Sequence, residues 1–346
     1  MIRVGIVNDV KLAAEVLRRV VVSLPEAEVA WIAENGAQAV ARCQADRPDL
    51  VLMDLLMPVM DGVEATHQIM QRSPCPILVV TATVSGNSDK VFDALGHGAL
   101  DTVNTPVLGR DGNLAGGEEL VQKIRNIVRL RCGNAAGLNV GPPPRTSAES
   151  SPPPVEAPLL VIGASTGGPQ AVASVLARGD HPLPYSVVLV QHLDPRFVPG
   201  LTDWLSRVSG MSVRPIGIGE RPQVGKVHVA CTENHLALRT AGDFQYVREP
   251  ADHVYRPSVD VFFHSLLRAG ASPGVAVLLT GMGRDGAAGM KALQQAGWRT
   301  IAQDEDSSVV WGMPRAAIQL GAADDVLPLD QIGPAISKIS AASQTP

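Results

Sequence analysis

A serine set among glycines follows an apolar run in the second half of the chain. The run Leu159–Ile162 reads as a buried strand, and residues 163–168 (Gly-Ala-Ser-Thr-Gly-Gly) follow it directly. Small residues around Ser165 permit a tight turn that exposes its hydroxyl. A helical pattern begins near Pro169, and the free N–H groups and positive dipole end of such a helix can stabilise an oxyanion. Ser165 is therefore a candidate nucleophile.

Two later strand ends offer the partners that a serine nucleophile needs. A serine hydroxyl is a weak nucleophile near neutral pH and requires a base, and His192 follows the apolar run Ser186–Gln191. The base needs an orienting acid, and Asp285 follows the run Val275–Thr280 within a Gly-rich segment. Functional groups gather at the carboxyl ends of parallel strands. We therefore expect these three side chains to meet.

Each of these features has a simpler interpretation when it is taken alone. A Gly-rich turn after a strand often binds phosphate, although residues 163–168 have neither the Walker lysine nor the Gly-x-Gly-x-x-Gly spacing. His192 could be a satisfied histidine at a strand end, and Asp285 could be a turn residue between glycines. Only their joint placement indicates a catalytic triad.

The first half carries a second set of polar residues at strand ends. Asp9, Asp54 and Thr81 each follow an apolar run; the runs are Ile2–Val7, Leu50–Met53 and Ile77–Val80. Two carboxylates at one sheet edge can hold Mg²⁺, which prefers hard oxygen ligands. A metal-bound aspartate can attack a phosphoryl donor, and the Thr81 hydroxyl could then bond the new phosphoryl oxygen. Taken singly, Asp9 and Asp54 would be loop aspartates that cap helices.

The elements that must position these residues alternate between strands and helices. Val10–Leu24 and Gly36–Gln44 have helical patterns between the apolar runs, which predicts a parallel α/β sheet. The same alternation returns in the second half. From Gly133 to Pro158 the chain is rich in proline, which favours extended, semi-rigid structure. We predict α/β domains at residues 1–125 and 157–346, with a proline-rich linker at 126–156.

The composition agrees with this division and excludes several classes of protein. A chain of 346 residues suits two domains, and 3% aromatic residues suits aliphatic cores of buried parallel strands. A net charge of −5 without a basic block argues against nucleic-acid binding. No apolar run approaches the ~20 residues of a membrane span, and no signal-peptide pattern begins the chain. The four cysteines form no CxxC pair, which predicts a reducing cytoplasm without a zinc site.

Residues 53–62 (Met-Asp-Leu-Leu-Met-Pro-Val-Met-Asp-Gly) resemble the phosphorylation loop of two-component receiver domains, which have a flavodoxin-like fold. The resemblance implies that Asp54 is the phospho-acceptor, that Asp9 and Asp54 bind Mg²⁺, and that Thr81 is the switch hydroxyl. Two positions depart from the pattern. Asn8 stands where receivers usually have an acid, and Thr105 stands where they usually have a lysine before a proline. Phosphorylation is expected, with weakened coupling to the switch.

Three motifs of the second half are similar to the active-site motifs of CheB, the chemotaxis protein-glutamate methylesterase family. They are residues 163–169, residues 191–192 (Gln-His) and residues 280–286 (Thr-Gly-Met-Gly-Arg-Asp-Gly). Residues 256–260, 302–305 and 312–315 also match, so the resemblance covers residues 157–330. It implies a doubly wound parallel α/β esterase domain. It also implies hydrolysis of glutamate methyl esters on chemoreceptors to glutamate and methanol, with glutamine deamidation in some members.

The same resemblance assigns roles to the candidate residues. Ser165 would be the nucleophile, His192 the general base and then acid, and Asp285 the orienting carboxylate. Oxyanion donors would be backbone N–H groups near Thr166 or Met282, between which the sequence does not choose. The esterase would need no cofactor, whereas the receiver would use Mg²⁺.

The resemblance also implies partners and regulation. A chemotaxis-type histidine kinase would supply the phosphoryl group, and the unphosphorylated receiver would restrain the esterase by packing over its active-site face. In the receiver, the run Val7-Asn8-Asp9 and the missing lysine at Thr105 are most similar to Wsp-type surface-sensing methylesterases. Two other interpretations are open. One is a receiver fused to a transcription effector, against which the acidic chain argues; the other is a receiver fused to a non-catalytic scaffolding or nucleotide-binding domain.

Overall fold

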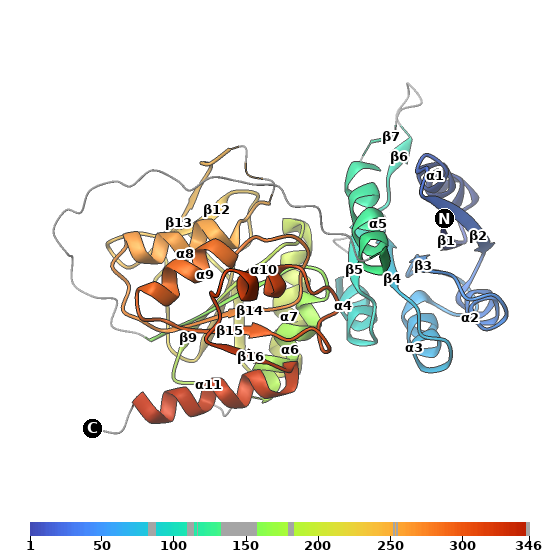
Figure 1. Ribbon diagram of the computed structural model, residues 1–346. Coiled ribbons are helices and arrows are strands. Elements are labelled where there is room, and N and C mark those ends of the chain that lie inside the picture. The colour runs from blue at the N-terminus through green and yellow to red at the C-terminus, as the bar shows by residue number, and fades with distance from the viewer. Residues whose placement is uncertain are drawn as a thin grey trace. The chain divides into compact units, whose positions relative to one another are not determined.

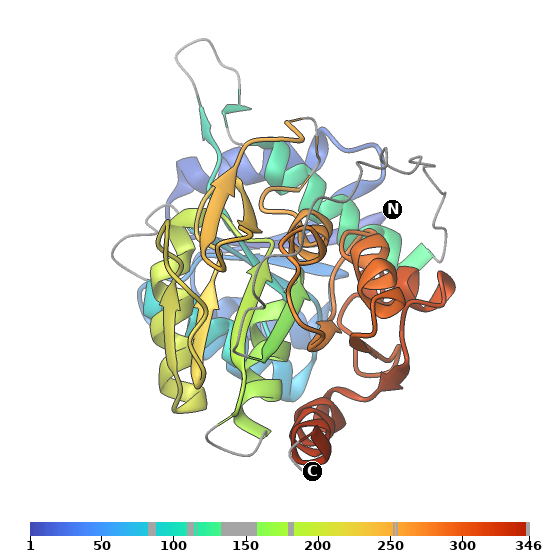
Figure 2. The same cartoon turned by 90° about the vertical axis from the view of Figure 1, so that its left-hand side faces the viewer.

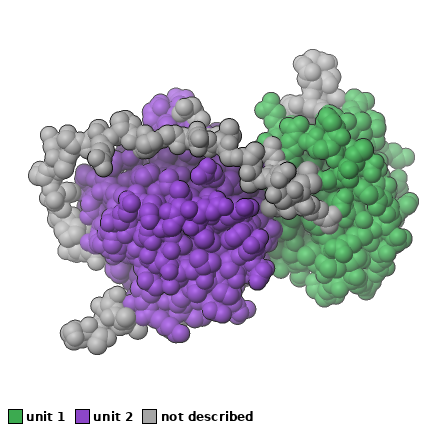
Figure 3. All heavy atoms as spheres, in the orientation of Figure 1, with its two compact units in different colours: residues 1–144 green, residues 145–346 purple. Residues whose placement is uncertain are grey.

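The computed structural model describes residues 1–81, 88–108, 114–115, 117–132, 158–178, 183–251, 253 and 255–343. The chain divides into two compact units, residues 1–144 and 145–346 (Figure 3). Most of the predicted linker, from residue 133 onward, lies outside the described residues. Helix α5 (Gly117–Cys132) continues past residue 125. The domain limits at 125 and 157 stay predictions.

A five-stranded parallel sheet forms the centre of the first unit, in the order β2-β1-β3-β4-β5 (Figure 1). Its strands are β1 (Ile2–Val7), β2 (Ala27–Ala33), β3 (Leu50–Met53), β4 (Ile77–Thr81) and β5 (Asp101–Asn104). Two short strands, β6 (Val107–Leu108) and β7 (Leu114–Ala115), pair antiparallel with each other, and β6 contacts α1 (Lys11–Val22). The strand order is that of flavodoxin-like folds, so the predicted fold is confirmed.

Helices cover both faces of this sheet. Helix α1 (Lys11–Val22) packs with α5, while α2 (Gly36–Ala45), α3 (Gly62–Arg72) and α4 (Ser88–Gly96) pack in series. Side-chain caps define where two of them begin: Asn35 accepts a hydrogen bond from Gln38 N, and Asp61 accepts one from Glu64 N. Strands β1, β3 and β4 are almost wholly apolar because helices bury them on both sides.

A seven-stranded parallel sheet forms the second unit, in the order β10-β11-β9-β8-β14-β15-β16. Figure 2 shows its green and yellow strands from another side. Its strands are β8 (Leu159–Ala164), β9 (Ser186–Gln191), β10 (Ser212–Pro215), β11 (Lys226–Val229), β14 (Val275–Leu278), β15 (Arg299–Gln303) and β16 (Asp325–Leu327). The chain winds outward from β8 in one direction, then returns to β14 on its other side. The sheet is therefore doubly wound, as predicted, with a topological switch point between β8 and β14.

Two groups of helices sandwich the second sheet. Helix α6 (Gly168–Arg178) packs with α7 (Val198–Ser209) and α11 (Leu329–Ser343), and η1 (Pro195–Phe197) leads into α7. On the other face, α9 (Ala287–Gln295) packs with α8 (Val259–Arg268) and α10 (Met313–Gln319). A hairpin of β12 (His235–Leu238) and β13 (Phe244–Val247) lies against α8. Among the described helices, none combines the length and apolarity needed to cross a membrane.

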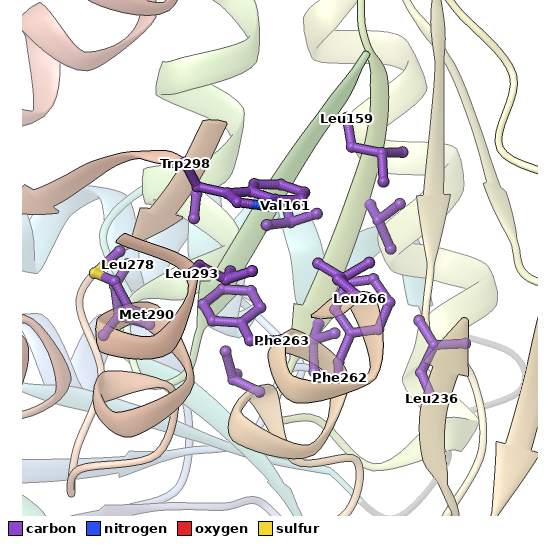
Figure 4. Packing of buried hydrophobic residues seen from close by; sticks show 14 of the residues in the cluster. Leu159, Val161, Leu236, Phe262, Phe263, Leu266, Leu278, Met290, Leu293 and Trp298 are labelled. Carbon is purple, nitrogen blue, oxygen red and sulfur yellow. The ribbon is translucent and has the colours of Figure 1, made fainter. Parts of the chain in front are cut away.

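An apolar core fixes α8 and α9 to the sheet (Figure 4). Phe262, Phe263 and Leu266 project from α8, and Met290 and Leu293 project from α9; all five are fully buried. Burying one such side chain stabilises the fold by about 1.5–3 kcal/mol. This packing matters for the site because the loops that precede α8 and α9 carry its polar residues.

Candidate active sites of the two units

The turn after β8 presents Ser165 at the switch point of the second sheet. Ser165 N donates to Thr280 O at 3.1 Å, and Gly168 N donates to Ser165 O at 2.8 Å. The buried amide of Gln191 adds a donor, since its Nε2 lies 2.8 Å from Ser165 O and 3.2 Å from His192 O. Three hydrogen bonds thus fix the backbone of the turn at Ser165.

His192 follows β9, the strand next to β8. His192 N donates to Ala164 O at 3.0 Å, which ties the histidine to the residue before the serine. Its Nε2 lies 2.8 Å from Asp285 Oδ2. The other ring nitrogen, Nδ1, is buried and has no hydrogen-bond partner in the described part of the chain. Because Asp285 occupies Nε2, Nδ1 is the atom left to accept a proton from a serine hydroxyl.

Asp285 lies in the loop between β14 and α9 and not at the strand end itself, which is Leu278. Gly283 and Gly286 flank it with φ values of 88° and 90°, a region that side chains disfavour. These glycines let the loop fold back over the sheet edge. The contact between His192 and Asp285 was predicted, but it depends on the way this loop folds back. The pattern of apolar residues in the sequence does not predict that fold of the loop.

The start of α8 surrounds the Asp285 carboxylate with donors. Ser258 Oγ lies 2.7 Å from Oδ1, Val259 N lies 2.7 Å from Oδ2, and Asp260 N lies 3.1 Å from Oδ1. Such N–H groups at a helix N-terminus favour an anion. Burial raises the pKa of Asp285, but the His192 contact and these donors outweigh it and hold the pKa below its usual value. Asp285 is therefore the ionised partner of His192.

A second carboxylate, Asp260, lies beside Asp285 and titrates differently. Gly289 N donates to Asp260 Oδ1 at 2.6 Å, so Asp260 links α8 to the first turn of α9. Burial, and then the negative charge of Asp285, raise the pKa of Asp260 to about 7. The pKa of Asp285 is thus lowered while the pKa of its neighbour Asp260 is raised. Such pairs are common in active sites where the two acids have different roles.

The two oxyanion candidates both lie next to Ser165. Thr166 follows it in the chain, and Thr166 O accepts a hydrogen bond from Thr280 Oγ1 at 3.0 Å. Met282 follows Gly281, at which a Cβ atom would lie 2.7 Å from Ser165 Cβ. Both backbones therefore border the nucleophile, and their role as oxyanion donors stays a prediction.

Sequence reasoning gave no role to three side chains of this site: Gln191, Ser258 and Tyr255. Tyr255 stacks on His192 with ring centroids 4.4 Å apart and planes at 1°. Ser258 had a detectable signal, because Pro-Ser-Val-Asp is a helix-start pattern and Ser258 Oγ accepts a hydrogen bond from Val261 N. Gln191 belongs to the motif at residues 191–192, but the motif does not show what its side chain contacts. Tyr255 had no signal, since only the three-dimensional fold shows its neighbours.

In the first unit, Asp54 follows β3 and lies beside the end of β1. Asn8 Nδ2 donates to Asp54 Oδ2 at 3.1 Å, and Leu55 N donates to Asp54 Oδ1 at 2.7 Å. Partial burial raises the pKa of Asp54, and the negative charge of exposed Asp9 raises it further. The structure thus brings these two acids near each other, with the amide of Asn8 in contact with one of them.

The residues around Asp54 fit a magnesium ion. Among the described residues no group of three or more His, Cys, Asp or Glu side chains gathers into a metal cage. Mg²⁺ does not require one, because it commonly uses one or two carboxylates and keeps several waters. A cation between Asp9 and Asp54 would offset the cost of burying the Asp54 charge, which is the main cause of its raised pKa, and the smaller repulsion from Asp9. Asp9 and Asp54 are the residues that would hold it.

Thr81 and Thr105 lie at the same edge of the first sheet. Thr81 is the last residue of β4 and is buried, and Thr105 N donates to Thr81 O at 3.0 Å. Thr105 directly follows β5 and stands at the position where receivers usually have a lysine. The threonine hydroxyl cannot supply the positive charge of that lysine.

The fold and the two sites define a class: a receiver-type unit followed by a parallel α/β unit with the serine, histidine and aspartate of a serine hydrolase. Comparison with known proteins agrees. Residues 4–111 match the response regulator receiver domain model, and residues 160–336 match the CheB methylesterase model. The chain belongs to the CheB methylesterase family.

Individual relatives extend this match over nearly the whole chain. A protein-glutamate methylesterase/protein-glutamine glutaminase of Cupriavidus metallidurans is 49% identical and covers 96% of both chains. One from Bordetella avium is 48% identical over 99% of both chains. The crystal structure of the Thermotoga maritima CheB catalytic domain is 33% identical with a TM-score of 0.51; the match covers 53% of this chain and 99% of that one.

Proposed function

We propose that this protein is a phosphorylation-regulated esterase that hydrolyses glutamate methyl esters on methyl-accepting chemoreceptors, and that it also deamidates receptor glutamines. The observation that carries the proposal is the buried contact of His192 Nε2 with Asp285 Oδ2, beside the rigid turn of Ser165. The names of the relatives supply the reaction. A non-catalytic scaffolding domain is not favoured, because it would not need this paired histidine.

In the proposed reaction, Ser165 Oγ attacks the ester carbonyl while His192 Nδ1 takes the hydroxyl proton. Asp285 stabilises the imidazolium that forms. Backbone N–H groups near Thr166 or Met282 would bind the oxyanion. The intermediate then collapses, the C–O bond to the methoxy group breaks, and His192 returns the proton to release methanol. Water, activated by His192, hydrolyses the acyl-serine to give glutamate.

For the receiver unit, we propose that Asp54 Oδ attacks the phosphorus of a donor such as the phosphohistidine of a histidine kinase. The new O–P bond forms as the P–N bond breaks, and the imidazole of the donor leaves. Mg²⁺ bound by Asp9 and Asp54 would neutralise charge at the phosphoryl group. Thr81 would then bond a phosphoryl oxygen. The unphosphorylated receiver would restrain the esterase. The phosphoryl group would relieve this restraint by replacing the single negative charge of the Asp54 carboxylate with a phosphoryl charge of about −1.5 to −2 at the sheet edge. Action in the cytoplasm and membership of a Wsp-type pathway are further parts of the proposal.

The test is methanol release from methyl-labelled chemoreceptor by the full chain, with and without a small phosphodonor. We expect release to rise with the donor in the presence of Mg²⁺, and to be abolished in Ser165→Ala. Asp54→Asn should keep the basal rate and lose the response. If Ser165→Ala released methanol at the wild-type rate, the proposed mechanism would be wrong.

A further inference from the structure

The ring of Tyr255 lies flat against one face of the His192 imidazole. The ring centroids are 4.4 Å apart and the planes differ by 1°. The His192 side chain is only 9% exposed, so the tyrosine contributes to shielding it from water. Asp285 approaches the same imidazole at Nε2. Tyr255 and Asp285 therefore contact His192 in different directions, one at the ring face and one at a ring nitrogen.

The surroundings of Tyr255 hold its ring in this position. A Cβ atom on Gly283 would lie 2.6 Å from Tyr255 Oη, so the phenol end rests against the loop that carries Asp285. Three residues after Tyr255, Ser258 donates to Asp285 and begins α8. The phenol end of the ring and the chain that follows Tyr255 thus both lie in the environment of the same carboxylate, which limits the freedom of the ring to move away.

The chemistry of the proposed reaction gives this stacking a purpose. His192 is neutral before it accepts the Ser165 proton and is a cation afterwards. A cation within about 6 Å of an aromatic ring face is attracted by the ring quadrupole, whereas a neutral imidazole gains less. An interaction that strengthens as the transition state forms accelerates the chemical step. Burial and the charge of Asp285 raise the pKa of Tyr255, so the phenol stays neutral near pH 7.

We propose that Tyr255 is a positioning residue for His192 whose ring face stabilises the protonated imidazole during proton transfer from Ser165. The inference rests on the proposed function in one respect, that His192 is the base for Ser165. It adds a second stabilising group for the imidazolium besides Asp285. The ring acts through its π face, so the tyrosine hydroxyl is dispensable.

The test uses the full chain with Tyr255 replaced by phenylalanine carrying no, one, two or three ring fluorines. Fluorine weakens the attraction of a ring for a cation and changes its size little. The rate of covalent modification of Ser165 by a fluorophosphonate is measured across pH. We expect Tyr255→Phe to keep the wild-type rate, and the fluorinated rings to lower the plateau stepwise by about two- to thirtyfold in total. In the profile of rate against pH, the fall in rate on the acid side should move to lower pH, because the weaker ring attraction stabilises protonated His192 less.

A matched control is the same fluorine series at Phe244, whose ring packs near His228 at 5.6 Å, outside the proposed triad. This series should leave the rate and the acid side of its pH profile unchanged. Equal rates along the Tyr255 series would overturn the inference, as would a Tyr255→Phe rate as low as that of Tyr255→Leu. Methanol release is measured separately. A chain that reacts with the fluorophosphonate but releases no methanol would contradict the proposed substrate and leave the Tyr255 result standing.

Discussion

At the scale of single residues, Ser258 shows how one hydroxyl serves both the helix and the site. Its Oγ donates to Asp285 Oδ1 at 2.7 Å and accepts from Val261 N at 3.2 Å, while Ser258 N donates to His235 Nδ1 at 3.2 Å. The residue is fully buried. The helix start and the proposed triad therefore share the Ser258 hydroxyl, while the backbone N–H of the same residue contacts the hairpin strand β12.

We predict that Ser258→Ala lowers kcat for methanol release by about ten- to hundredfold with little change in KM, because a hydrogen bond to a charged group contributes about 1.5–3 kcal/mol. Loss of the cap should also lower the free energy of unfolding by about 1 kcal/mol. Asn35→Ala is the matched control, since it removes a helix cap far in sequence from the triad. A similar loss of kcat in both variants would assign the effect to stability alone.

Asp260 gives a prediction on pH. Its pKa is raised to about 7 in the folded protein, against 3.8 for an unperturbed aspartate, because it is buried beside Asp285. Between these values the folded state binds the proton and the unfolded state does not. Proton binding by Asp260 therefore adds to the free energy of unfolding. This addition is fully present below pH 3.8 and is lost as pH rises toward 7. Asp260→Asn cannot lose a proton.

The free energy of unfolding of Asp260→Asn, relative to wild type, should therefore rise between pH 4 and pH 8. Denaturant titrations of the full chain at several pH values measure it. Glu233→Gln, at an exposed position, is the control and should show no such trend. A difference between Asp260→Asn and wild type that stays constant with pH would contradict the raised pKa.

At the scale of elements, close packing of loops sets the position of Ser165. Gly281 lies between the serine turn and α10: a Cβ there would be 2.3 Å from Met313 Sδ and 2.7 Å from Ser165 Cβ. Gly312 N and Met313 N both donate to Gly281 O. The loops after β14 and before α10 thus approach the nucleophile so closely that only glycine fits between them.

Gly281→Ala should therefore displace Ser165 and lower its rate of reaction with a fluorophosphonate by about a hundredfold, the typical cost of a misplacement near 1 Å. Gly217→Ala is the control, because its nearest atom outside the chain neighbours, Glu220 Cγ, would be 3.4 Å away. Circular dichroism verifies that both variants are folded. Wild-type reactivity in Gly281→Ala would show that the loop yields without moving the serine.

The strands were predictable from sequence, whereas the loops were not. β1, β3 and β9 begin and end at the predicted residues, because fully buried parallel strands leave continuous apolar runs. Ser165 and His192 could be placed because each directly follows such a run. The contacts of Tyr255 and Ser258 could not, since they depend on how the loops before α8 and α9 fold back. Hydrophobic periodicity carries no information on those loops.

At the scale of the whole molecule, both units place their candidate reactive residue at the switch point of a parallel sheet. In the first sheet the chain reverses direction between β1 and β3, and Asp9 and Asp54 follow those strands. In the second it reverses between β8 and β14, and Ser165 follows β8. Loops diverge at such switch points and leave room for a ligand. Each unit therefore has a candidate site of its own at a switch point of its own sheet, and the proposed regulation must link these two sites.

The strength of that link leads to a prediction about Thr105. Thr105 follows β5, and β4 lies between β5 and the Asp54 strand. Two strand spacings are about 10 Å, a gap that a long, charged side chain can reduce and a threonine cannot. Without the lysine that receivers usually have here, a phosphoryl group on Asp54 attracts the end of β5 less strongly. A phosphoryl group shifts the restrained and active states only by its difference in free energy between them.

Thr105→Lys should therefore increase the ratio of methanol release with phosphodonor to release without it, in the full chain and in the presence of Mg²⁺. Thr105→Met is the control, because methionine extends the side chain without adding charge and should leave the ratio at the wild-type value. The double variant Asp54→Asn, Thr105→Lys should show no response to the donor. An unchanged ratio in Thr105→Lys would mean that the cation at β5 does not limit coupling here, and that the signal leaves Asp54 through Thr81 alone.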